Sequence, residues 1–120
     1  MLRALATVLV LASLATPAFA QDRTPAARQA LVDLANVLGE SHALLRACKG
    51  RDSFHWYSKM EQMLRVEAAD QTLKVRLIES FNTGYTAGMA RYPSCSNASR
   101  AQAAQLATRG RILAGPLAQP

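Results

Sequence analysis

Two cysteines are the residues whose chemistry is most directly constrained by this sequence. Cys48 and Cys95 are the only cysteines in the 120-residue chain. In a protein exported to an oxidising compartment, two cysteines are more often paired than free. A bond between them would close a ring of about 47 residues, which in the loop-entropy model constrains the unfolded chain by roughly 4 kcal/mol. The alternative is that one of them serves as a catalytic thiol.

The two histidines are weaker candidates for chemistry. Glu40, Ser41 and His42 are consecutive, and neighbouring side chains on a helix point in different directions, so they cannot form a catalytic relay. Neither His42 nor His55 has a second metal ligand three or four residues further along, so a metal site would need ligands from separate helices. We expect His42 to pack on a helix stripe with a local hydrogen bond, and we predict no catalytic residue, metal or cofactor.

A set of basic residues around one tryptophan is the best candidate for a binding surface. Trp56 lies beside the apolar stripe of its predicted helix and is expected to be partly exposed. We expect Lys49, Arg51 and Arg91 near the same end of the fold, where they could bind a sugar or a partner. The other aromatic residues of this region are predicted to be mainly core: Phe54, Tyr57, Tyr85 and Tyr92.

Four helical segments must position these side chains. A cap at Thr24 followed by Pro25 is a typical helix start, and large apolar residues then recur at helical spacing. The second helix is expected to bury a face of Phe54, Tyr57, Met60, Met63 and Leu64. The predicted segments run from Thr24 to Cys48 before Lys49-Gly50, from Asp52 or Ser53 to residues 67–69, from Asp70 to Tyr92, and from Ser96 or Asn97 to Leu113.

The predicted fold is all-α, a small up-and-down four-helix bundle with one disulfide. Short connections favour antiparallel packing of consecutive helices, so the end of the first helix and the start of the fourth share one end of the bundle. This topology brings Cys48 close to Cys95. Gly84 and Gly88 in the third helix suggest a close approach, which we assign to the alanine-rich fourth helix. Gly115-Pro116 is read as the stop of that helix.

The first 20 residues have the order of segments typical of a secretory signal peptide. Arg3 gives a positive start, residues 4–16 form an uncharged apolar run, and residues 18–20 are a small-x-small cleavage signal. The run is shorter than the roughly 20 residues of a membrane-spanning helix, so we expect no transmembrane anchor. We predict a cleaved signal at residues 1–20, periplasmic export, and one helical domain at 21–120 with a core of about 24–114.

The charge of the chain constrains its partners. Fourteen Lys and Arg residues stand against eight Asp and Glu, and loss of Arg3 with the signal leaves a mature net charge of +5. A basic exported protein meets anionic lipids, lipopolysaccharide or wall polymers rather than nucleic acid, although the charge could also serve solubility alone. We therefore predict a non-catalytic periplasmic module that binds an anionic envelope component or an envelope protein. The sequence assigns no oligomeric state.

Scattered motifs run along the chain: Leu38-Gly39-x-x-His42, Leu45-Arg46-x-Cys48, Trp56, Met60, Leu64, Glu67, Arg76, Phe81-Asn82-x-Gly84-Tyr85, Tyr92-x-x-Cys95 and Gly110. Together these motifs make the chain similar to an uncharacterised family of small exported alphaproteobacterial proteins. The resemblance implies export, helices and paired cysteines, and it transfers no activity. A looser similarity, in size, export and a single disulfide, is to acid-activated periplasmic chaperones, which makes an acid-stress holding chaperone the alternative function.

Overall fold

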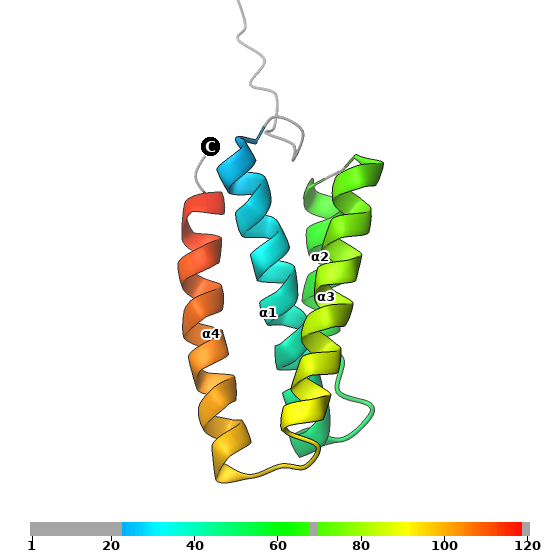
Figure 1. The fold of residues 1–120 in the computed structure, drawn as a ribbon, viewed down its shortest axis with the longest axis vertical. Helices are drawn as coiled ribbons and strands as arrows, with labels where there is room; N and C mark the ends of the chain where they lie inside the picture. Colours follow the sequence, from blue (N-terminus) through cyan, green and yellow to red (C-terminus); the bar gives the residue numbers. More distant parts are fainter. Residues whose placement is uncertain (1–22, 68–69, 119–120) are drawn as a thin grey trace, which may run out of the picture.

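The computed structural model describes residues 23–67 and 70–118, which form four α-helices and no strand (Figure 1). The predicted signal peptide, residues 1–20, lies outside the described residues. The helices follow one another up and down, which confirms the predicted all-α bundle. Their bounds are Pro25–Lys49 for α1, His55–Glu67 for α2, Gln71–Arg91 for α3 and Asn97–Leu117 for α4.

Local capping explains where most of the helices begin and end. Thr24, Asp70 and Ser96 cap α1, α3 and α4, and each side chain accepts a hydrogen bond from the backbone N–H three residues further along. These caps satisfy N–H groups that have no partner within the helix. Gly50 ends α1 with a φ of 96°, a left-handed conformation that glycine adopts without steric cost. The predicted start and stop of α1 are therefore confirmed.

Two helix boundaries differ from the prediction. The backbone carbonyl of Phe54 accepts the first hydrogen bond of α2 from the N–H of Ser58, at 2.8 Å, so neither Asp52 nor Ser53 is the cap. The α2 start had been inferred from cap-forming residue types alone, and α2 has instead a backbone-defined start at His55.

The end of α4 also differs, since the helix passes through Gly115 and Pro116 to Leu117. Proline removes one backbone hydrogen bond from the last turn. Two contacts favour the longer helix: Leu117 packs against the core, and its carbonyl accepts a hydrogen bond of 3.0 Å from the guanidinium of Arg23. The predicted stop at Gly115-Pro116 is therefore wrong.

Helix α1 is the central element of the bundle and packs against each of the other three helices. Figure 1 shows α4 on one side of α1, with α2 and α3 on the other. Burial of apolar surface from α1 therefore holds the whole arrangement together. One buried cluster joins α1 to α2 and α3, and a smaller one joins α1 to α4. The first comprises Leu31, Ala35, Leu38, Met60, Leu73, Leu77 and Phe81, and the second comprises Val37, Leu44 and Leu106.

Glycines set the close contact between α1 and α3. A Cβ atom at Gly39 would overlap the backbone carbonyl of Phe81, and a Cβ atom at Gly84 would overlap that of Asn36. At Gly88 the added atom would lie 2.9 Å from Cβ of Ala43 in α1. The small residues of α3 therefore admit α1, and the prediction that they admit the fourth helix is wrong. A helical glycine signals close approach but does not specify which helix approaches.

The buried face of α2 is rotated from the predicted one. Phe54 and Tyr57 are 53% and 43% exposed, whereas Met60 is buried and Trp56 and Met63 pack against the core. Trp56, Met60 and Met63 follow a spacing of four and three residues, which is also helical. Periodicity allowed both stripes, and the prediction chose the one with more aromatic residues.

Candidate functional site

An apolar groove runs between α2 and α4, with α1 as its floor. The two helices make little contact with each other, so their inward side chains line an open space of about 610 Å³. This volume falls within the range of ligand sites in proteins, roughly 300–1,000 Å³. The apolar lining comprises Leu31, Leu34, Val37 and Leu38 of α1, Trp56, Met63 and Val66 of α2, and Leu106, Ala107, Ala114 and Leu117 of α4.

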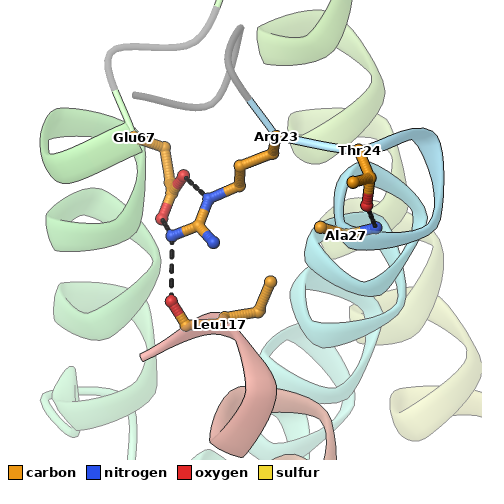
Figure 2. Close-up of polar contacts among 5 residues, drawn as sticks. All are labelled: Arg23, Thr24, Ala27, Glu67 and Leu117. Atoms are coloured by element: carbon orange, nitrogen blue, oxygen red, sulfur yellow. Dashed lines mark hydrogen bonds and ion pairs between the residues drawn. The ribbon is translucent and has the colours of Figure 1, made fainter. Parts of the chain in front are cut away.

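A polar bridge joins α2 to α4 at one end of the groove (Figure 2). Arg23 donates to both carboxylate oxygens of Glu67, at 2.7 and 2.9 Å, and to the carbonyl oxygen of Leu117, at 3.0 Å. A two-pronged pairing of this kind is among the stronger charge-assisted contacts. Glu67 lines the groove, and Arg23 balances its charge. Sequence analysis missed this bridge, because its partners lie 44 and 94 residues apart.

A second hollow of about 300 Å³ lies beside the disulfide, next to the other end of the groove. Cys48 is bonded to Cys95, which ties the end of α1 to the segment before α4 and confirms the predicted pair. Lys49 and Arg100 also line this hollow, which we call the basic hollow. Ser41 and Trp56 line both spaces. The apolar groove and the basic hollow therefore adjoin each other at these two residues.

The four residues of the predicted binding surface are divided by the structure. Lys49 and Trp56 line the basic hollow, and Trp56 is half-buried against the core rather than standing free. Arg51 lies in the α1–α2 connection and Arg91 is the last residue of α3, and both are exposed outside the hollow. Arg100 belongs to the hollow and was missed, because its position one turn into α4 carries no distinguishing sequence signal.

Two further basic residues lie on the rim of the groove, Lys59 from α2 and Arg111 from α4. Both are exposed. Arg111 donates to the hydroxyl of Thr108 at 3.2 Å, and neither cation forms an ion pair with any residue in the described ranges. Since Glu67 is already balanced by Arg23, the unbalanced charge around the groove is positive.

His42 lies in a different place, between α1, α2 and α3. Its ring centroid is 5.3 Å from that of Tyr85, 5.8 Å from Tyr57 and 5.9 Å from Phe81. Among the described residues its Nδ1 has no hydrogen-bond partner, so the expected local hydrogen bond is wrong for that atom. Burial lowers the pKa of His42, and the nearby positive charge of Arg46 lowers it further.

The three consecutive residues Glu40, Ser41 and His42 point apart, as their helical positions require. Glu40 Oε1 accepts a hydrogen bond of 3.2 Å from Gln102 on α4, Ser41 lines the groove, and His42 faces the aromatic rings. In residues 23–67 and 70–118, no three His, Cys, Asp or Glu side chains are grouped so that they could hold a metal ion. None of the described helices combines the length and apolarity needed to cross a membrane.

Fold and site together define a small helical domain, closed by one disulfide, with a long apolar groove and a basic end. The chain belongs to the family described as "Protein of unknown function (DUF2385)", which matches residues 27–120. No curated protein and no solved structure shows significant similarity to it. The family match supports the expected relation to an uncharacterised family and assigns no activity.

Proposed function

We propose that the mature domain is a non-catalytic binding module of the bacterial periplasm. The observation that carries this proposal is the apolar groove between α2 and α4, which adjoins a basic hollow at the disulfide end. An apolar pocket with a few convergent polar groups is the usual form of a binding site. The ligand is an anionic component of the envelope, or an envelope protein with an acidic surface.

The compartment is inferred from two features of the chain. Residues 1–20 have the pattern of a secretory signal peptide, and the bond between Cys48 and Cys95 is of the kind that persists in oxidising compartments. The similarity to exported alphaproteobacterial proteins supports the same location. An exported, basic domain meets anionic phosphates and carboxylates at the envelope.

The non-catalytic part of the proposal is supported by where the reactive side chains lie. Both cysteines are used in the disulfide, so neither offers a thiolate. His42 is 5% exposed and enclosed by aromatic rings, and its neighbours Glu40 and Ser41 point to other helices. A general base has to reach the proton that it abstracts, and His42 is placed to pack.

Retention of the mature protein on immobilised lipopolysaccharide or wall polymer tests this function. We expect retention on at least one of the two, weakened by added salt, because exposed charge interactions are screened. Replacing Lys49 and Arg100, the basic residues of the hollow, by glutamine should weaken it. The matched control replaces Arg65 and Lys74 by glutamine, because both are exposed outside the groove and the hollow. Retention that ignores both salt and the substitution of Lys49 and Arg100 would refute an electrostatic binding role.

An acid-stress holding chaperone is the second candidate, and two groups favour it. The lowered pKa of His42 means that the fold favours the neutral, buried ring, so protonation of His42 in acid destabilises the fold. The backbone N–H of Leu73 and the guanidinium of Arg28 lower the pKa of Asp70, so protonation of Asp70 in strong acid also loosens the fold. The discriminating assay is aggregation of a client protein at about pH 3 and about pH 7. We expect no more protection in acid than a control of similar size and charge gives.

A further inference from the structure

We infer that the groove binds a single-chain lipid with an anionic headgroup, its acyl tail between α2 and α4 and its head in the basic hollow. This inference rests on the proposed binding function and names the class of ligand. It requires three properties of the site: an apolar tract for the chain, a positive region for the head, and a reason to prefer a lipid over a second protein.

The tail site is the groove itself. Its floor is α1, whose Leu31, Val37 and Leu38 are buried, and Met63 and Leu106 belong to its walls. An extended protein segment in such a groove would bring backbone N–H and C=O groups into an apolar surface, where unpaired polar groups are costly. An acyl chain brings none. Each methylene that enters gains about 0.8 kcal/mol, which is roughly a fourfold increase in affinity.

The head site is assigned by charge. At one end of the groove the guanidinium of Arg23 is occupied by Glu67 and Leu117 (Figure 2). At the other end, Lys49 and Arg100 line the hollow, and neither forms an ion pair within the described part of the chain. An anionic head therefore gains more at the disulfide end than at the Arg23 end.

Charge also argues against a second copy of the chain as the occupant. The mature protein carries a net charge of +5, and Lys59 and Arg111 stand on the rim of the groove without ion-pair partners among the described residues. A second copy would bring like charge toward these cations, and such juxtaposition disfavours association. An anionic amphiphile matches both the apolar walls and the positive rim.

Binding of straight-chain amphiphiles to the mature, disulfide-bonded protein tests the inference. Trp56 is the only tryptophan of the chain and lines both the groove and the hollow, so its fluorescence reports occupancy directly; calorimetry gives the affinity. Below the micelle concentration, tetradecanoate should bind roughly 15-fold more tightly than dodecanoate, because two methylenes are added. Tetradecanol and tetradecyltrimethylammonium, which lack the anionic head, should both bind more weakly than tetradecanoate.

Two pairs of variants locate the tail and the head. Ala114→Phe fills the groove, whereas Ala104→Phe adds the same ring at an exposed position of α4 outside it; only the first should abolish binding. Replacing Lys49 and Arg100 by glutamate should lower the affinity for tetradecanoate roughly tenfold and leave the affinity for tetradecanol unchanged. The same charge change at Arg65 and Lys74, which lie outside both spaces, is the control.

Several results would overturn the inference. Equal binding of tetradecanoate and tetradecanol, or no difference between the two double-charge variants, refutes the head site. An equal effect of Ala114→Phe and Ala104→Phe refutes the tail site. A dimer that Ala114→Phe dissociates, with no lipid bound, identifies a second copy as the occupant. Retention on lipopolysaccharide or wall polymer without any amphiphile binding refutes the ligand class and leaves the proposed function intact.

Discussion

Replacing Gly84 by alanine places one methyl group into the contact between α1 and α3. Alanine gains about 1 kcal/mol over glycine in a helix that has room for it. Here the new Cβ would overlap the carbonyl oxygen of Asn36 and lie 3.0 Å from its carbonyl carbon. Overpacking of a tight interior costs about 1–3 kcal/mol, and a backbone carbonyl cannot rotate away as a side chain can. We therefore take the upper end of that range, about 3 kcal/mol, and subtract the helical gain of about 1 kcal/mol, so that the expected net loss in the free energy of unfolding is about 2 kcal/mol.

Thermal unfolding followed by circular dichroism measures this loss. For a domain of about 100 residues, 1 kcal/mol corresponds to roughly 4–8 °C in Tm, so Gly84→Ala should lower Tm by about 8–16 °C. Gly110→Ala is the matched control on α4. Its added Cβ would lie 3.5 Å from Cγ1 of Val37, an ordinary contact, so it should raise the free energy of unfolding by up to about 1 kcal/mol.

A second substitution in the same interface sharpens the test. In Gly39→Ala on α1, the added Cβ would overlap the backbone of Phe81. This substitution should lower the free energy of unfolding by about as much as Gly84→Ala. Once one alanine has moved the helices apart, the second meets less resistance, so the double variant should lose less than the sum of the two. If Gly84→Ala raised Tm as Gly110→Ala does, or if the two costs were additive, the close α1–α3 contact would be refuted.

Two further predictions concern the disulfide and acid stability. Replacing Cys48 and Cys95 by serine should lower the free energy of unfolding by about 4 kcal/mol in the loop-entropy model, measured by urea unfolding; a loss below about 1 kcal/mol would contradict that model. The folded pKa of His42 is below its ordinary 6.5, so the unfolded state binds the proton more tightly, and stability should fall as pH decreases from about 7 to about 5. His42→Phe should flatten this dependence, as pH-dependent denaturant unfolding would show.

The sequence predicted the parts of the fold that depend on local chemistry. A helix cap needs only a side-chain oxygen and a backbone N–H three residues away, so Thr24, Asp70 and Ser96 could be identified from their neighbours. The pairing of Cys48 with Cys95 was predicted because they are the only two cysteines, and the alternating direction of the helices agreed with it by bringing their two ends together. These inferences need no knowledge of distant packing.

The features that were missed depend on which surfaces meet in three dimensions. Trp56 and Tyr57 are neighbours, and helical periodicity allowed either one to face the core. In the structure Trp56 packs against the core and Tyr57 is exposed. Gly84 signalled a close approach, but only the packing shows that Asn36 of α1 approaches it. Arg23 pairs with Glu67 across 44 residues, and no spacing rule connects them. Long-range packing decided each case.

The groove follows from the position of α1 at the centre of the bundle. The glycines of α3 allow its backbone to lie against α1, so α3 packs closely on one side of α1. With α2 and α4 also packed on α1, each buries its apolar stripe there, and little surface remains for contact between α2 and α4. At one end of the groove Arg23 joins α2 to α4, and at the other end the disulfide ties α1 to the segment before α4. The groove between α2 and α4 is thus bounded at both ends. The two helices do not pack against each other along its length, so its apolar surface stays open. The open groove leaves apolar area in water that a tighter bundle would bury, which costs stability. A ligand that covers this area when it binds would recover that free energy.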